Sequence, residues 1–123
     1  MRMEKSPFNK LSIFFPMWNE ESYIERAIDA AREECEDLMA QGDIADYEMI
    51  VIDDASTDRS LSILKAWSEK DNRVRTIQNE KNLGVAKTLN RGLALATGQW
   101  IARMDSDDIS RKEYPFDFFF FIL

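Results

Sequence analysis

Three carboxylates stand within four residues near the end of the sequence: Asp105, Asp107 and Asp108. Like charges this close repel one another and are costly to bury, so a folded protein keeps them in water or around a cation. They follow a short apolar run, Trp100 to Met104, that predicts a buried strand. Ligands of open α/β sheets bind at the carboxyl ends of strands, and Asp-x-Asp can offer two carboxylates to one hard ion. The cluster therefore favours Mg²⁺ or Mn²⁺, although an isolated Asp-x-Asp is more often a solvated acidic turn.

Two further strand ends carry side chains that suit a nucleotide. Asp53 and Asp54 follow an apolar run, and one of these carboxylates could accept hydrogen bonds from a base N–H or a ribose hydroxyl. The alternative is that they cap the Ser56–Thr57 turn. The segment Pro16-Met-Trp-Asn-Glu20 ends an earlier run, and Trp18 within it could stack on a planar base or pack against the following helix.

Two cations stand near the acidic cluster in the sequence. Lys87 precedes it on a predicted helix, and Arg103 lies within the predicted strand. Either could offset the charge of a diphosphate, but ordinary surface cations or ion-pair partners explain them as well.

The composition excludes several kinds of site. There is no histidine, which rules out Ser-His-Asp triads and histidine metal sites. The single cysteine, Cys35, cannot form an intrachain disulfide, and its place on an apolar helix side indicates a packed core thiol. The net charge of −7 argues against a nucleic-acid partner. The sequence contains no G-x-G-x-x-G and no Walker motif, which argues against dinucleotide and P-loop sites.

The apolar pattern predicts the elements that would position these side chains. Strands are expected at 11–16, 47–52, 74–78 and 100–104, with a helix between each pair. Asn19 is the expected N-cap of the first helix, with Glu20 and Glu21 in its first turn. Apolar residues at steps of three and four mark the core side of that helix: Ile24, Ala27, Ile28, Ala31, Cys35 and Leu38.

The remaining helix ends are also marked in the sequence. Gly42 should close the first helix, Ser56 or Thr57 should cap the second, and Gly98 should be the C′ residue of the third. The alternation of strands and helices predicts one small α/β domain, with a Rossmann-like parallel sheet and helices on both faces.

The end of the sequence departs from this pattern. Residues 116–123 are almost wholly aromatic and aliphatic, which is a β-aggregation hazard for a free end. Either this segment packs into the sheet or the chain is a piece of something longer, and no fifth strand is obvious. No convincing signal peptide or membrane-spanning run is found, so we expect a cytoplasmic protein, with peripheral membrane attachment left open.

Four segments together resemble the nucleotide-sugar-binding half of a family 2 glycosyltransferase: Pro16–Glu20, Ile50–Asp58, Asn79–Gly84 and Ala96–Asp108. The resemblance covers residues 11–110 and leaves 111–123 as a divergent Phe-rich tail. It implies the A-type glycosyltransferase fold and a nucleoside-diphosphate sugar donor, most often a UDP-sugar. It also implies a divalent metal, and inverting transfer to a hydroxyl of a glycan or lipid-linked acceptor.

The resemblance further implies a set of site residues. Those expected at the nucleotide sugar are Pro16, Met17, Trp18, Glu20, Asp53, Asp54, Lys87 and Asp105, and those expected at the metal are Asp105 and Asp107. The metal would act as a Lewis acid on the departing diphosphate. The catalytic base is expected in a C-terminal half that the family normally has and this sequence does not match.

The resemblance therefore describes a single partial domain over 1–123, and a truncated or frameshifted gene is the expected cause. The alternatives are a non-catalytic nucleotide-binding remnant and a receiver-like signalling domain, although receivers place their acidic pair after the first strand. A sugar-nucleotide pyrophosphorylase lacks support, because its Gly-rich basic loop is missing.

An exposed sheet edge, left where the other half would pack, predicts self-association.

Overall fold

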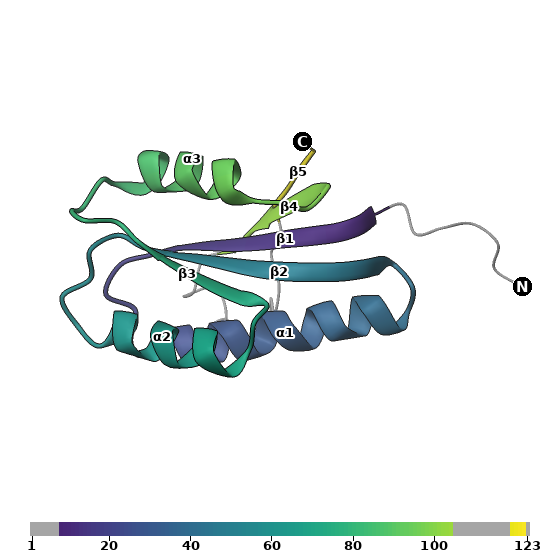
Figure 1. Ribbon diagram of the computed structural model, residues 1–123, viewed down its shortest axis with the longest axis horizontal. Helices are drawn as coiled ribbons and strands as arrows, with labels where there is room; N and C mark the ends of the chain where they lie inside the picture. The colour runs from purple at the N-terminus through teal and green to yellow at the C-terminus, as the bar shows by residue number, and fades with distance from the viewer. Residues whose placement is uncertain (1–7, 105–118, 123) are drawn as a thin grey trace, which may run out of the picture.

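A computed structural model describes residues 8–104 and 119–122 of the chain. Its strands form one sheet in the order β3-β2-β1-β4-β5. In chain order the elements are β1 (Phe8–Met17), α1 (Ile24–Ala40), β2 (Ile44–Asp53), α2 (Ser60–Lys70), β3 (Val74–Gln78), α3 (Val85–Leu95), β4 (Trp100–Arg103) and β5 (Phe119–Ile122). Strands β1 to β4 are parallel, and Figure 1 shows α1 and α2 on one face of the sheet and α3 on the other. The predicted α/β architecture is confirmed.

The pleat of the central strand divides the core into two layers. Leu11, Ile13 and Phe15 of β1 face α1 and α2, while Phe14 faces α3. All four side chains are buried, as expected for a strand between two covered faces of a parallel sheet. The layer beneath α3 is the smaller one, and Gly92 of that helix lies close to the Phe14 ring.

Helix α1 confirms the predicted apolar stripe but begins later than expected. Its first residue is Ile24, and Tyr23 is the N-cap. Asn19 is therefore not the N-cap, which corrects the prediction, and Glu20 and Glu21 precede the helix. Gly42 closes α1 as predicted, with φ of 81° and its N–H donating to the Met39 carbonyl at 3.1 Å.

The core stripe of α1 contains the only cysteine of the sequence. Cys35 is fully buried, and burial raises the pKa of its thiol to about 12. A thiol that stays protonated at neutral pH is a poor nucleophile, so Cys35 is a core residue, as predicted.

Two other predicted caps are wrong. Helix α2 begins at Ser60, whose N–H donates to the Asp58 carboxylate at 2.9 Å, whereas the Ser56 and Thr57 side chains contact Asn19 instead. Helix α3 ends at Leu95 with an extended C-cap residue, so Gly98 is not its C′ residue. Both segments make contacts with distant parts of the chain, which local sequence rules do not anticipate.

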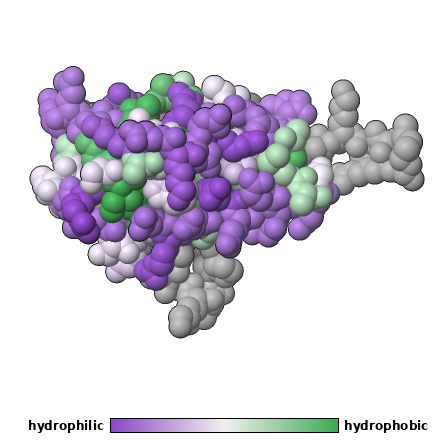
Figure 2. Space-filling view, turned by 60° about the horizontal axis from the view of Figure 1, so that its bottom comes forward, coloured by the Kyte–Doolittle hydropathy of each residue, from purple (hydrophilic) through white to green (hydrophobic). Residues whose placement is uncertain are grey.

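The Phe-rich end packs into the sheet, which was one of the two alternatives for this segment, although the sequence shows no obvious fifth strand. Residues Phe119–Ile122 form β5, which pairs antiparallel with β4 and places Trp100 opposite Ile122. The Phe-rich segment thus contributes a strand to the sheet. In the part of the chain that the structure describes, no helix has the length and apolar character needed to cross a membrane, and the face with α1 and α2 is mostly hydrophilic (Figure 2).

Candidate functional site

The ends of β1 and β2 meet at the carboxyl edge of the sheet. Pro16 of β1 pairs with Ile52 of β2. The pairing of β1 with β4 ends earlier along β1, at Phe14 and Arg103. The Asp54 N–H donates to the Met17 carbonyl at 2.7 Å, which joins the two strands where they end. The structure therefore places the predicted Pro16–Met17 and Asp53–Asp54 segments side by side.

Trp18 follows directly and is turned to the solvent. Its residue surface is 52% exposed, so the ring is not buried against α1. An exposed aromatic ring at the carboxyl edge of a parallel sheet is available to stack on a planar ligand.

Asn19 ties the loop after β1 to the loop after β2. Its backbone N–H donates to Ser56 Oγ at 2.9 Å, and its Oδ1 accepts the N–H groups of Thr57 at 2.8 Å and Asp58 at 3.3 Å. Asn19 adopts a φ of 50°, a left-handed conformation that asparagine tolerates better than most residues. The bonds fix the loop that carries Trp18 against the turn that follows Asp54.

The same two loops are joined at their far ends. The Glu20 N–H donates to Ser60 Oγ at 2.9 Å, and the Glu21 N–H donates to the Asp58 carboxylate at 3.2 Å. Glu21 also forms an ion pair with Arg59 at 2.9 Å. Burial alone raises the pKa of Asp58, but hydrogen bonds from Ser60 and Glu21 outweigh it and hold that pKa below its usual value.

The two carboxylates after β2 have different surroundings. Asp53 is fully buried, and its carboxylate accepts the Ser56 N–H at 3.3 Å. Asp54 Oδ1 accepts the Leu83 N–H at 2.7 Å, and its Oδ2 accepts the Gly84 N–H at 3.0 Å. Asp54 thus lies at the N-terminal end of α3, where a negative charge is favourable.

Hydrogen bonding sets the protonation state of Asp54. Burial alone raises its pKa, but hydrogen bonds from Leu83, Asn79 and Gly84 outweigh burial and lower it. Asp54 is therefore an anion at neutral pH that organises the loop over 79–84.

Asn79 connects this loop to α3. It is 1% exposed, and its Nδ2 donates to Asp54 Oδ1 at 2.9 Å and to Thr88 Oγ1 at 3.0 Å. Its Oδ1 accepts a hydrogen bond from Arg91. The loop after β3 is thus held by β2 on one side and by α3 on the other.

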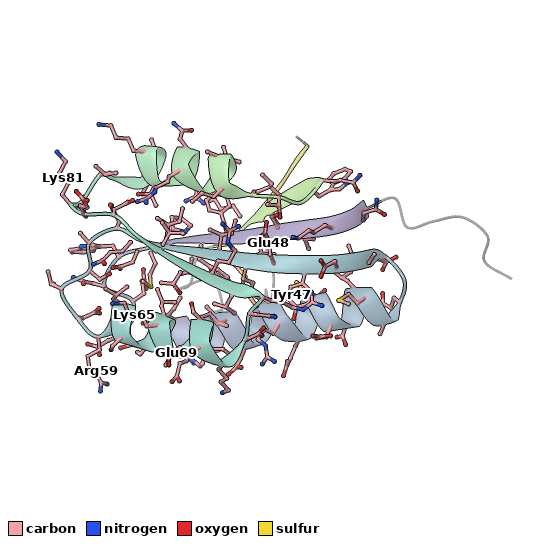
Figure 3. All side chains as sticks on the ribbon, in the orientation of Figure 1. Tyr47, Glu48, Arg59, Lys65, Glu69 and Lys81 are labelled. Carbon is pink, nitrogen blue, oxygen red and sulfur yellow. The ribbon has the colours of Figure 1, made fainter. Side chains whose placement is uncertain are left out.

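Lys87 is exposed near the start of α3, and it forms no ion pair with any residue in the described ranges 8–104 and 119–122. Lys81 extends from the loop before it, at the same end of the sheet (Figure 3). Positive charge is therefore present at the carboxyl edge despite the overall charge of −7.

The predicted metal ligands Asp105 and Asp107 lie outside the described residues, as does Asp108. Within 8–104 and 119–122, no group of three or more His, Cys, Asp or Glu side chains could hold a metal ion.

The residues that hold the site together differ from those that the sequence marks. Asn19 is a tertiary contact and not a helix cap, Asn79 is more than a member of its motif, and Thr88 and Arg91 carry no local signal. The available signal is the polar character of Asn19 and Asn79, which stand within two residues of a strand end.

Comparison with known proteins identifies the family. Residues 12–115 match the family model described as glycosyl transferase family 2. An uncharacterized glycosyltransferase of Haemophilus influenzae is 36% identical over 112 residues, which cover 91% of this chain and 32% of that protein. The putative teichuronic acid biosynthesis glycosyltransferase TuaG of Bacillus subtilis is 31% identical over 103 residues, covering 84% of this chain and 38% of that protein. This chain spans about a third of the length of these relatives.

Solved structures of glycosyltransferases share the fold. TarS 1–349 of S. aureus, in complex with UDP-GlcNAc, matches with a TM-score of 0.64 at 30% identity, over 80% of this chain and 26% of TarS. The mannosyltransferase PcManGT of Pyrobaculum calidifontis, in complex with GDP-Man and Mn²⁺, matches with a TM-score of 0.64 at 26% identity, over 79% of this chain and 27% of that one. These matches confirm the A-type glycosyltransferase fold and exclude the receiver-like alternative. The family model matches most of the chain, including the edge that joins β1, β2 and α3. This chain therefore belongs to glycosyl transferase family 2.

Proposed function

We propose that this chain forms the donor-binding region of a glycosyltransferase that uses a nucleoside-diphosphate sugar, with UDP as the expected nucleotide. The observation that carries the proposal is the exposed Trp18, held at the carboxyl edge beside the Asp53–Asp54 turn by the bonds of Asn19. The complexes of TarS with UDP and UDP-GlcNAc and of PcManGT with GDP-Man support this class of donor.

The proposed roles follow the position of each side chain. Trp18 stacks on the base, and Glu20 lines the nucleoside pocket next to Pro16 and Met17. Asp53, which is fully buried, supports the floor of this pocket by accepting the Ser56 N–H. Asp54 lines the same pocket and shapes it through its hydrogen bonds to the loop over 79–84. Lys87, exposed near the start of α3, offsets part of the diphosphate charge.

Asp105 and Asp107 would hold the divalent metal, because carboxylate oxygens suit Mg²⁺ and Mn²⁺. The complex of PcManGT, which contains Mn²⁺, supports the use of a divalent metal. The metal would supply Lewis-acid stabilisation of the departing diphosphate. An acceptor hydroxyl of a glycan or lipid-linked compound would form a bond to the anomeric carbon as the bond to the diphosphate breaks, with inversion. The proton of the acceptor hydroxyl would pass to a catalytic base, and we assign no residue of this chain to that role.

Calorimetric titration of the purified chain with UDP, with and without Mn²⁺, tests the proposal. We expect binding that strengthens when Mn²⁺ is present. The absence of UDP binding to a sample shown by circular dichroism to be folded would contradict the proposal.

The Asp107→Asn variant tests the metal assignment separately. It should bind UDP equally with and without Mn²⁺, because an amide is a weaker ligand for a hard cation. Asp29→Asn, an exposed change on α1, is the matched control and should keep the Mn²⁺ dependence. Undiminished Mn²⁺ dependence in Asp107→Asn would refute the assignment of that residue.

A further inference from the structure

Glu48 is a buried carboxylate in the middle of the sheet to which the proposed function gives no role. It is 5% exposed, and it belongs to β2 opposite Ser12 of β1. Figure 3 shows it at the sheet on the side of α3, while the neighbouring Tyr47 points to α1. A buried charge is costly unless it is fully hydrogen-bonded, so its partners indicate what it does.

The partners come from three different segments. Glu48 Oε2 accepts Ser12 Oγ–H of β1 at 2.7 Å, and the N–H and hydroxyl of Thr97 at 2.7 and 2.9 Å. Its Oε1 accepts a hydrogen bond from Arg75 of β3 at 3.1 Å. Burial alone raises the pKa of Glu48, but the bonds from Ser12, Thr97 and Arg75 outweigh it, so the group is an anion at neutral pH.

Ser12 extends this network by one residue. Its Oγ accepts the Gly98 N–H at 2.8 Å. A Cβ added to Gly98 would lie 2.6 Å from Ser12 Oγ and 2.8 Å from the backbone oxygen of Lys10, so only glycine fits at this position. We call Glu48, Ser12, Thr97 and Gly98 the Glu48 clamp.

The Glu48 clamp lies where the chain enters β4. The next residue, Gln99, donates its N–H to the Lys10 carbonyl at 3.0 Å, and Trp100 then pairs with Leu11. Strand β4 is only four residues long. At its end the Met104 N–H donates to the Phe14 carbonyl at 3.0 Å, and the next residue in the sequence is Asp105.

A short strand has few ladder bonds of its own to specify its register. The clamp adds charge-assisted hydrogen bonds, which are stronger than neutral ones, at the residues that precede β4. We infer that Glu48 is a positioning residue that fixes the register of β4 against β1, and through it the point at which the chain leaves the sheet toward Asp105. The functional part of this inference rests on the proposed function; the structural part does not.

Amide hydrogen exchange of the 123-residue chain tests the structural part. Glu48→Gln removes the charge and leaves one acceptor oxygen, which cannot serve both the Arg75 guanidinium and the Ser12 and Thr97 donors. We expect the Gln99 and Met104 amides to exchange at least about tenfold faster, because the loss of one hydrogen bond to a charged group has about that effect on a local opening equilibrium. The Met49, Asp54 and Asn79 amides, which bond between β1, β2 and β3, should keep their protection. A uniform change, or none, would overturn the inference.

Titration with UDP tests the functional part. Glu48→Gln should lose most of the increase in UDP affinity that Mn²⁺ gives the unaltered chain, while its affinity without Mn²⁺ stays the same. Leu64→Ala, a buried change in α2 on the other face, is the control for general destabilisation and should keep that increase. An undiminished Mn²⁺ effect in Glu48→Gln would overturn the functional part. If the unaltered chain binds no UDP, the proposed function fails, and hydrogen exchange still decides the role of the clamp.

Two milder variants guard against a Glu48→Gln chain that does not fold. Thr97→Val removes one hydroxyl donor to Glu48, and Ser12→Ala removes the link to Gly98. Both leave the carboxylate in place. Each should speed exchange of the Gln99 amide more than that of the Met49 amide. Equal effects on the two amides would contradict the clamp.

Discussion

Trp18 shows how a single side chain on this edge is prepared for binding. Among the large apolar residues of the described ranges that are exposed, Trp18 is the most exposed aromatic one. Its neighbour Asn19 is nevertheless fixed by several hydrogen bonds. An exposed ring on a fixed backbone loses little conformational entropy on binding.

Trp18→Ala should therefore lower the affinity for UDP by about 1–3 kcal/mol, the usual contribution of base stacking. Trp18→Phe should retain most of the affinity, because a smaller ring still stacks. Tyr23→Ala removes another exposed aromatic near this edge and serves as the control in the same calorimetric titration. Equal affinities of Trp18→Ala and the unaltered chain would contradict the stacking role.

Asp54 leads to a prediction on pH. The pKa of Asp54 in the folded state lies below its value in the unfolded chain, which is about 3.9. The ionised Asp54 therefore stabilises the fold fully at a pH above the unfolded pKa. This stabilisation is lost as the pH falls through the folded pKa. Asp54→Asn should lower the free energy of unfolding by about 1.5–3 kcal/mol at pH 7, and by less as the pH falls below about 4.

Urea denaturation at several pH values measures this difference. Asp29→Asn is an exposed control on α1 and should change the free energy of unfolding by no more than about 0.5 kcal/mol. A difference between Asp54→Asn and the unaltered chain that does not vary with pH would show that the charge of Asp54 is unimportant.

At the scale of the elements, the approach of α3 to the sheet depends on a glycine. A Cβ on Gly92 would lie 2.8 Å from Phe14 Cδ2 and 3.1 Å from Ile52 Cδ1. Both neighbours are fully buried side chains of the smaller core, so neither can move freely.

Gly92→Ala should lower the free energy of unfolding by up to about 2 kcal/mol, because overpacking costs about 1–3 kcal/mol and the gain in helix propensity returns about 1 kcal/mol of it. Asn90→Ala, an exposed change in the same helix, should leave stability equal or slightly higher. Urea denaturation of both variants provides the comparison. A Gly92→Ala variant as stable as Asn90→Ala would show that the core accommodates the methyl group.

For the whole molecule, β5 covers the edge of β4 that would otherwise be open. An uncovered strand edge presents unpaired N–H and C=O groups that can pair with another chain. β5 is in turn the outermost strand on this side of the sheet, so the Phe-rich end covers β4 but presents an outer edge of its own.

We expect the covering of β4 to be the larger effect, so deletion of residues 119–123 should lower the monomer fraction in size-exclusion chromatography, increasingly so at higher protein concentration. The full 123-residue chain at the same concentrations is the reference. A higher monomer fraction after deletion would instead identify the Phe-rich end as the source of self-association.

The sequence by itself determined the sheet and the place of the site. Apolar runs and helical spacing depend on local chain geometry, so they predicted four parallel strands, three helices and the convergence of Pro16–Glu20 with Asp53–Asp54 at one edge. The order of the four motifs identified the family, which the comparisons confirm.

Only the tertiary structure decided which polar groups meet. Asn19 bonds to residues 37–39 positions away, and Glu48 bonds to Thr97, 49 positions away. Such partners depend on how helices and loops pack on the sheet, which no local pattern encodes. For the same reason the apparent caps Asn19 and Gly98 proved to be tertiary contacts. A Cβ at Gly98 would meet the backbone, and a Cβ at Gly92 would crowd two core side chains.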